Sequence, residues 1–259
     1  MSLVRGDVSD LASLERTMAD HEVTHVVHLA ALLVPFVRDD PPRGALVNVV
    51  GTTNVLEAAR RVGARGVAYA SSAAIYGPDD GSGPDDARSP ATLYGVFKRT
   101  NEETARLFWQ DHGLASVGLR PYVVYGPGRD IGITADPSLA MAAAARGEPY
   151  HIGWGGRCQF QYAPDVAHAF VAAARTEQRG AHAFNLGGPV SPMSEVVAAI
   201  DAAAPEMAGR ITFDDVQLPF PEGMDAGVFA EVVGDLPQTS LEDGVRETIE
   251  LYRRHRRAS

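Results

Sequence analysis

The chain has 259 residues, of which 45% are hydrophobic and 22% are charged, which fits one large folded domain with room for a smaller one. Its 23 Lys and Arg residues stand against 33 Asp and Glu residues, a formal net charge of −10 at pH 7. This acidity argues against nucleic acid and anionic membranes as partners, because both attract a basic surface. A single cysteine, Cys158, excludes an internal disulfide framework, and neither a signal peptide nor a membrane-spanning apolar run is visible. We therefore expect a cytoplasmic protein.

Strand-like and helix-like segments alternate along the chain. A β-branched run over residues 23–29 predicts a strand, and apolar residues at helical spacing predict a helix over 46–62 that Gly63 ends. The same criteria predict strands over 66–70, 115–120 and 183–186, helices over 91–112, 165–175, 191–204 and 240–253, and a loop rich in Gly, Pro and Asp over 77–86. This alternation indicates a parallel sheet with helices on both faces.

Tyr94 and Lys98 lie four residues apart in the predicted helix 91–112, so their side chains share a face. Lys98 is the only lysine among the basic residues, and arginine cannot replace lysine where a compact ammonium is needed. A cation beside a phenol favours the phenolate and lowers its pKa from about 10, which makes tyrosine usable as a base. The pair is a candidate acid/base unit.

Ser71 and Ser72 directly follow the predicted strand 66–70. Parallel α/β sheets bind ligands at the carboxyl ends of their strands, so a hydroxyl at this point can hold a substrate oxygen against Tyr94. Each residue taken alone is more commonly structural. We interpret Ser72, Tyr94 and Lys98 together as a catalytic trio.

Residues 21–25, HEVTH, match a zinc-binding pattern letter for letter. That pattern needs a helix to bring both histidines to one metal, whereas His25 opens a predicted strand, where positions i and i+4 stand about 13 Å apart. We predict no metal site.

Six motifs follow one another along the chain, namely residues 6–10, 28–31, 48–54, 71–77, the pair Tyr94 and Lys98, and residues 119–128. This series resembles the extended short-chain dehydrogenases/reductases, the NAD-dependent epimerase/dehydratase family typified by UDP-galactose 4-epimerases. The resemblance implies a doubly wound parallel (Rossmann) α/β sheet with a small C-terminal substrate lobe. It assigns residues 1–124 and 163–188 to the NAD-binding domain and residues 125–162 and 189–259 to the lobe.

The resemblance also implies roles for individual residues in hydride transfer through NAD, with NADP left open. Tyr94 would be the acid/base, Ser72 its hydrogen-bonding partner, and Lys98 would bind the nicotinamide ribose. Besides Tyr94 and Lys98, the residues expected to bind the cofactor are Asp7, Val8, Leu29, Ala30, Ala31, Asn48, Ala70, Ser71, Pro121 and Val123. The residues expected to bind substrate are Ser72, Arg129, Arg157 and Gln161.

The chain departs from the family at its N-terminus, where the family's first strand and G-x-x-G-x-x-G turn are not found. The glycine turn holds the cofactor's pyrophosphate, so we expect weak NAD binding and an N-terminally incomplete sheet. Residues 3–5 would then be the family's third strand without its neighbour, and the next strand would become an edge. Residues 81–83 and 153–156 also contain glycines, but we interpret both segments as loops.

Substrate positions depart as well. Cys158 and Val123 stand where nucleotide-sugar members usually place an Arg and an Asn, and Ala73 and Ala74 replace the acidic pair of the family's dehydratases. Dehydration is therefore not expected. We expect oxidation of a sugar hydroxyl by a nucleotide-sugar epimerase-like enzyme that can form a homodimer. The alternatives are a dehydrogenase of a free sugar acid or aldose, and a non-catalytic or fragmentary family member.

Overall fold

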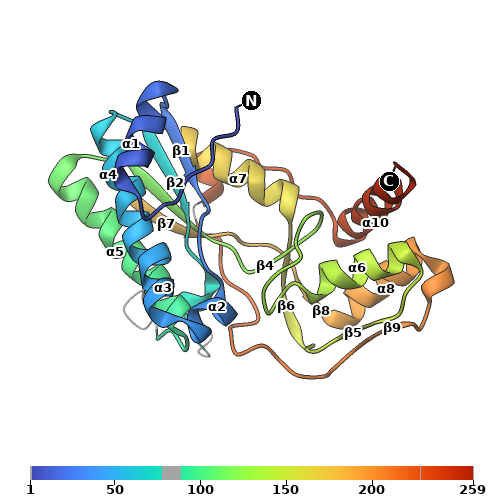
Figure 1. The fold of residues 1–259 in the computed structure, drawn as a ribbon. Coiled ribbons are helices and arrows are strands. Elements are labelled where there is room, and N and C mark those ends of the chain that lie inside the picture. Colours follow the sequence, from blue (N-terminus) through green and yellow to red (C-terminus); the bar gives the residue numbers. More distant parts are fainter. Residues whose placement is uncertain (1, 78–88, 228, 259) are drawn as a thin grey trace.

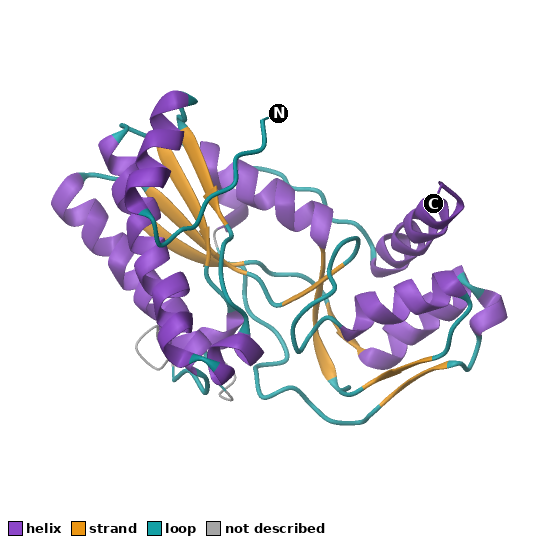
Figure 2. Cartoon of the chain, viewed as in Figure 1, coloured by secondary structure: helices purple, strands orange, loops and turns teal. Residues whose placement is uncertain are grey.

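The computed structural model describes residues 2–77, 89–227 and 229–258, which form two packed parts (Figures 1 and 2). The first part is built on a parallel four-stranded sheet in the order β1-β2-β3-β7. Its strands are β1 (His25–His28), β2 (Gly66–Ala70), β3 (Ser116–Arg120) and β7 (Ala181–Asn185). Because the strands are parallel, their carboxyl ends meet at one edge, which faces the second part of the molecule (Figure 1).

Helices cover both faces of this sheet (Figure 2). On one face, Val67 and Tyr69 pack into a core with helices α1 (Leu11–Asp20), α4 (Gly51–Arg61) and α5 (Leu93–His112). On the other face, Ala68 packs with Phe170 of α7 (Ala163–Arg175) and with α9 (Phe229–Val233). Alternate residues of β2 thus serve two cores, as the pleat of a strand dictates. The predicted doubly wound α/β fold is confirmed.

The second part has its own core and smaller sheets. It contains β4 (Val123–Tyr125), β6 (Arg157–Tyr162) and β8 (Val190–Pro192) in one sheet, and β5 (Tyr150–Ile152) with β9 (Ile211–Phe213) in another. Helices α6 (Asp136–Arg146), α8 (Met193–Ala203) and α10 (Leu241–Ala258) pack on them around buried Met141, Ile200 and Ile249. No helix in the described part of the chain is long and apolar enough to cross a membrane.

The predicted elements of the first part are found within a few residues of their expected bounds, with two differences. The helix expected from residue 46 begins as a π-helical turn, η1 (Leu46–Val50), and continues as α4. The strand expected at residues 3–5 does not form, because no neighbour pairs with it and Leu3 is 89% exposed. β1 is accordingly the edge of the described sheet, as expected.

Among the expected loops, residues 153–156 connect β5 to β6 as predicted. Apart from Gly77, the loop expected over residues 77–86 lies outside the described residues, and so does the segment 81–83. The chain also forms the short helices α2 (Val34–Asp39) and α3 (Pro41–Ala45) and the 3-10 turns η2 (Ala73–Ile75) and η4 (Pro205–Met207).

Helix α5 is fixed at its start and its end. Thr92 caps it, with its hydroxyl accepting a hydrogen bond from the Gly95 amide at 3.1 Å, and Gly113 ends it in the left-handed conformation with φ of 68°. At the first turn α5 packs directly on η2, because a Cβ atom on Gly95 would lie 2.2 Å from the Ala74 carbonyl oxygen. Glycine at this position therefore sets how closely α5 approaches the turn after β2.

We predict that Gly95→Ala destabilises the fold even though alanine favours helices. The added methyl group meets backbone and must push α5 away from η2, so the free energy of unfolding should fall by about 1–3 kcal/mol. Gly6→Ala is the matched control, since a Cβ there meets nothing within 4 Å. Urea unfolding of both variants tests this, and a Gly95→Ala variant more stable than wild type would contradict it.

Candidate active site

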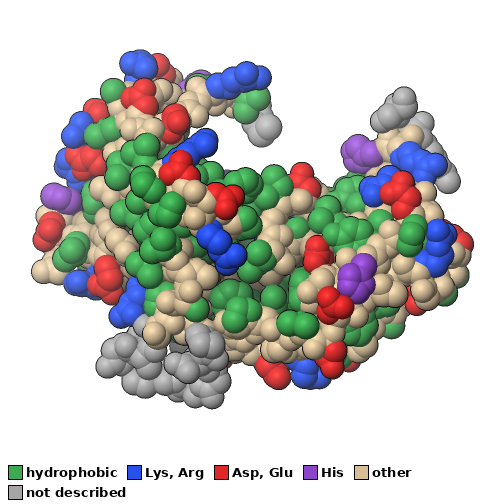
Figure 3. All heavy atoms as spheres, turned by 60° about the horizontal axis from the view of Figure 1, so that its bottom comes forward, with side chains coloured by type: hydrophobic (Ala, Val, Ile, Leu, Met, Phe, Trp, Pro, Cys, Tyr) green, Lys and Arg blue, Asp and Glu red, His purple; other side chains and the backbone are tan. Residues whose placement is uncertain are grey.

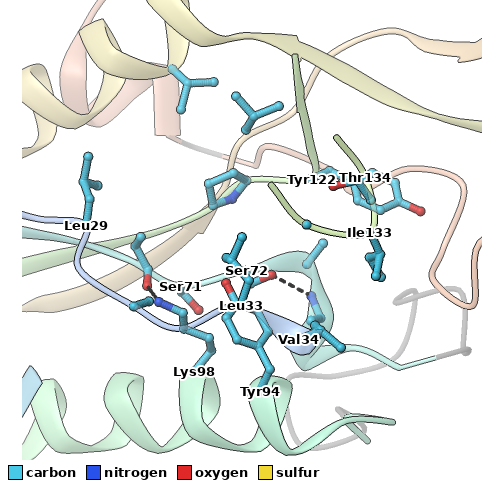
Figure 4. A pocket seen from close by; sticks show the side chains of 18 of the residues that line it. Leu29, Leu33, Val34, Ser71, Ser72, Tyr94, Lys98, Tyr122, Ile133 and Thr134 are labelled. Carbon is cyan, nitrogen blue, oxygen red and sulfur yellow. Dashed lines mark hydrogen bonds between the residues drawn. The ribbon is translucent and has the colours of Figure 1, made fainter. Parts of the chain in front are cut away.

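A pocket of about 330 Å³ opens at the carboxyl ends of the parallel strands and is lined by residues of both parts of the molecule (Figure 4). Ser71 and Ser72 reach it from the end of β2, while Tyr94 and Lys98 reach it from α5 (Figure 4). Arg129 contributes from the loop that follows β4. The remaining walls are largely apolar and include Leu29, Leu33, Val34, Val124, Ile133 and Phe220.

Lys98 is buried, with 3% of its surface exposed. Its Nζ donates a hydrogen bond to the Ala70 carbonyl oxygen at 2.6 Å and lies 5.5 Å from the centre of the Tyr94 ring. Burial lowers the pKa of Lys98 to about 8. An ammonium has three N–H donors, and within the described part of the chain only Ala70 accepts from this one, so two donors remain for other partners.

Ser72 links the turn after β2 to Tyr94. Its Oγ accepts a hydrogen bond from the Ala74 amide at 3.1 Å, and its side chain lines the pocket with that of Tyr94 and acts on the pKa of Tyr94. Burial raises the pKa of Tyr94, and Ser72 and the charge of Arg129 oppose that rise. The sequence predicted that Lys98 lowers this pKa, but burial outweighs the nearby groups and the pKa of Tyr94 is raised instead.

Arg129 brings a second cation to the pocket. Its Nη2 donates to Thr134 Oγ1 at 3.3 Å, whereas its Nε is buried without a hydrogen-bond partner among the described residues. Leaving a donor of a charged group buried and unpaired costs roughly 1–3 kcal/mol or more. An anionic or strongly accepting group entering the pocket would satisfy this donor.

Several residues predicted from the sequence converge on this pocket and others do not. The pocket is lined by Leu29, Ala31, Ala70, Ser71, Ser72, Tyr94, Lys98, Pro121 and Arg129. It is not lined by Asp7, Val8, Ala30, Asn48, Val123, Arg157 or Gln161. The proposed roles of both sets stay predictions, but the first set is where a ligand in this pocket would make contact.

Among the second set, the N-terminal residues lie outside the pocket. Asp7 is exposed, and hydrogen bonds from the Ser9 amide and hydroxyl, both at 2.8 Å, lower its pKa. Val8 packs against Gly51 of α4. Asn48 is buried and binds the backbone of Leu32 twice, accepting from its amide at 2.7 Å and donating to its carbonyl at 2.9 Å. Asn48 thereby holds the segment that forms one wall of the pocket.

Two of the expected substrate residues of the second part, Gln161 and Arg157, are engaged elsewhere, whereas Arg129 lines the pocket. Gln161 accepts from the Tyr122 amide at 2.8 Å and donates to the Leu186 carbonyl, so its amide is used by backbone. Arg157 is exposed and lies 3.6 Å from Glu222. Val123 and Cys158 are buried in the core of the second part, where burial raises the Cys158 pKa to about 12. Neither side chain faces the pocket.

Three buried polar residues next to the pocket were not singled out as site residues from the sequence, namely His28, Glu102 and Arg120. Thr52 donates to the Asn48 carbonyl at 2.7 Å, so His28 donates to Thr52 Oγ1 at 3.0 Å. Burial lowers the His28 pKa to about 4, with a further contribution from Lys98. Glu102 follows Lys98 by one helical turn, and this spacing was the one feature of the sequence that could have pointed to Glu102.

The histidines of the zinc-like pattern lie on different elements, since His21 ends α1 and His25 opens β1. No group of three or more His, Cys, Asp or Glu side chains suited to a metal occurs within residues 2–77, 89–227 and 229–258.

The fold and the pocket define an α/β protein with a ligand site at the strand ends and a lysine, a tyrosine and a serine within it. The sequence model described as NAD dependent epimerase/dehydratase family matches residues 1–187. The chain belongs to this family, and the expected enzyme class, NAD-dependent epimerase or oxidoreductase, is confirmed at that level.

Individual relatives agree with this assignment. A UDP-glucose 4-epimerase of Mycolicibacterium smegmatis is 31% identical over 96% of this chain and 82% of its own length. UDP-glucuronate 4-epimerase 2 of Arabidopsis thaliana is 29% identical, and the match covers 96% of this chain but only 63% of that relative. The solved structure of MoeE5 with UDP-glucuronic acid and NAD is 30% identical with a TM-score of 0.80, covering 97% of this chain and 85% of that one.

We predict that His28 makes stability fall in acid. Its folded pKa of about 4 lies below the ordinary 6.5, so the unfolded chain binds a proton first as the pH drops between these values. The corresponding loss is about 3 kcal/mol, complete only near the folded pKa. His28→Gln removes the titrating group but keeps a donor for Thr52. Denaturant unfolding from pH 7 to pH 4 should be flatter in the variant, and parallel curves would contradict the assignment.

Proposed function

We propose that the protein is an NAD-dependent epimerase that oxidises and re-reduces a hydroxyl-bearing carbon of a nucleotide sugar. The observation that carries this proposal is the convergence of Ser72, Tyr94 and Lys98 on one pocket at the strand ends. The names of the relatives, a UDP-glucose 4-epimerase and a UDP-glucuronate 4-epimerase, support the same reaction class.

The pocket residues fit a nicotinamide cofactor. Lys98 has two N–H donors to offer the hydroxyls of a ribose, and Leu29, Ala31 and Pro121 offer apolar walls for a flat ring. NAD, when bound, accepts a hydride from the substrate carbon and can return it. The chain's own residues then have to orient the sugar and move one proton.

Tyr94 is the group proposed to move that proton. As a phenolate it takes the proton from the sugar hydroxyl while the carbon loses its hydride, and as a phenol it gives the proton back to the keto oxygen. The Ser72 hydroxyl holds the same oxygen, and Ser72 also lowers the pKa of Tyr94 against the effect of burial. The charge of Arg129 acts in the same direction, in a pocket with apolar walls where charges interact more strongly than in water.

We predict that Tyr94→Phe lowers kcat by about 10²- to 10⁴-fold, the usual worth of a positioned acid/base group. The ring and its packing remain, so NAD binding should be unchanged. Turnover of a nucleotide sugar followed by chromatography and NAD binding followed by calorimetry give the two measurements. Near wild-type turnover in the variant would remove Tyr94 from the mechanism.

Arg129 bears on the substrate class. Its unpaired Nε and its place in the pocket favour a substrate with an acidic group, such as a nucleotide-linked uronic acid. A free sugar acid is the second candidate. One observation supports this second candidate. Arg157 and Gln161, which were expected to bind substrate, lie outside the pocket, so Lys98 and Arg129 are the only charged residues that line the pocket in the described part of the chain.

We predict that Arg129→Met weakens kcat/KM for UDP-glucuronate by roughly 10- to 100-fold more than for UDP-glucose, from about 1.5–3 kcal/mol per hydrogen bond to a charged group. Arg157→Met is the control, since that side chain is outside the pocket. Assays with glucuronate in parallel separate the two candidates. Accumulation of NADH with glucuronate would favour the dehydrogenase, and epimer formation without net NADH favours the epimerase. Equal losses for both UDP-sugars would contradict the role of Arg129.

A further inference from the structure

A buried ion pair lies directly beneath the proposed catalytic residues. Arg120, the last residue of β3, donates from Nε to Glu102 Oε1 and from Nη2 to Glu102 Oε2, both at 2.8 Å. Their side chains are 5% and 7% exposed. Neither residue lines the pocket, so neither is placed to contact a ligand there. A charge pair in the interior is expensive to desolvate and adds little net stability on average.

The pair is bonded to both ends of the turn that carries Ser72. At the start of the turn, Ser71 Oγ donates to Glu102 Oε1 at 2.5 Å. At its end, Arg120 Nη1 donates to the Tyr76 hydroxyl oxygen at 2.9 Å, and the guanidinium lies 5.6 Å from the centre of the Tyr76 ring. Ser72 thus lies within a short segment whose first and last side chains are held by one ion pair.

The same pair connects this turn to α5. Glu102 lies one helical turn after Lys98 and two after Tyr94, on the same helix face. Lys98 holds the Ala70 carbonyl and Glu102 holds the neighbouring Ser71 hydroxyl, so two successive residues of the strand end are fixed by α5. The distance between Ser72 and Tyr94 is therefore set by bonds on both sides of it.

We infer that Glu102 and Arg120 are positioning residues that hold Ser72 next to Tyr94 in the pocket. The inference rests on the proposed function for the meaning of that placement, but the placement itself can be measured without substrate or cofactor. In Glu102→Gln the amide nitrogen replaces one carboxylate oxygen, and because both oxygens accept from N–H groups of Arg120, at least one bond of the ion pair is lost together with the negative charge. The turn is then free to shift away from Tyr94.

The experiment uses the 259-residue chain with tyrosines labelled at the carbon that bears the hydroxyl, a nucleus whose chemical shift responds to hydrogen bonding. There are 8 tyrosines, and the resonance of Tyr94 is the one lost in Tyr94→Phe. Ser72→Ala gives its position without the serine hydroxyl. Glu103→Gln is the matched control, because Glu103 adjoins Glu102 but forms an exposed pair with Arg106 at 2.9 Å.

We expect Glu102→Gln to move the Tyr94 resonance toward its position in Ser72→Ala, and Glu103→Gln to leave it in place. A folded Glu102→Gln protein, shown by its melting curve, with Tyr94 at the wild-type position would overturn the inference. If Glu102→Gln does not fold, Tyr76→Phe takes its place, because it removes the bond from Arg120 to the Tyr76 hydroxyl and leaves the ion pair. The Tyr94 resonance should then move in the same direction, and an unchanged resonance would overturn the inference. A Ser72→Ala protein with no shift would instead refute the Ser72–Tyr94 contact of the proposed function, and the inference with it.

In kinetic assays the same displacement should raise the Tyr94 pKa and move the acidic limb of the kcat/KM profile to higher pH. A purely structural effect of Glu102→Gln would lower the active fraction at every pH and leave the limb in place. This readout separates positioning from stability.

Discussion

The hydrogen bond from the buried ammonium of Lys98 to the Ala70 carbonyl, 2.6 Å long, fixes α5 against the end of β2. A charge out of water must be partnered, so Lys98 cannot be accommodated here unless the strand end presents that oxygen. Once α5 is anchored, Tyr94 one turn earlier can only face the pocket. The close approach of Gly95 to η2 then brings the turn with Ser72 against the same helix. The geometry of the site follows from the packing of one helix on one strand end.

The charge of the pocket is opposite in sign to the net charge of the whole chain. The protein carries a formal charge of −10, yet the charged residues lining the pocket within the described chain are Lys98 and Arg129. Hydrophobic side chains form patches over the face drawn in Figure 3, interrupted by a few charged groups. Cations set among apolar walls favour an anionic ligand, and the charge of Arg129 opposes the rise that burial causes in the pKa of Tyr94. In the proposed mechanism, Arg129 therefore bears on both substrate choice and acid/base chemistry.

The sequence was sufficient for the sheet of the first part and for the family, because long periodic helices and β-branched strands leave clear patterns. It also identified Ser72, Tyr94 and Lys98 as candidate site residues. The spacing of Tyr94 and Lys98 puts them on one face of a helix, and Ser72 follows the carboxyl end of a strand. It did not reveal the short strands of the second part, such as β4 and β8, whose three residues carry no period. The inward placement of Val123 and the backbone contacts of Gln161 depend on tertiary packing, which spacing cannot report.

In the proposed mechanism, Tyr94 moves a proton at oxygen while the substrate carbon exchanges a hydride with NAD. The most direct test is a nucleotide sugar that carries deuterium on the carbon bearing the reacting hydroxyl, converted in ordinary water with NAD. Hydride transfer predicts that the deuterium is retained, either on that carbon in the epimer or on the reduced cofactor. Loss of the deuterium to water would show that the carbon is deprotonated instead, and would contradict it.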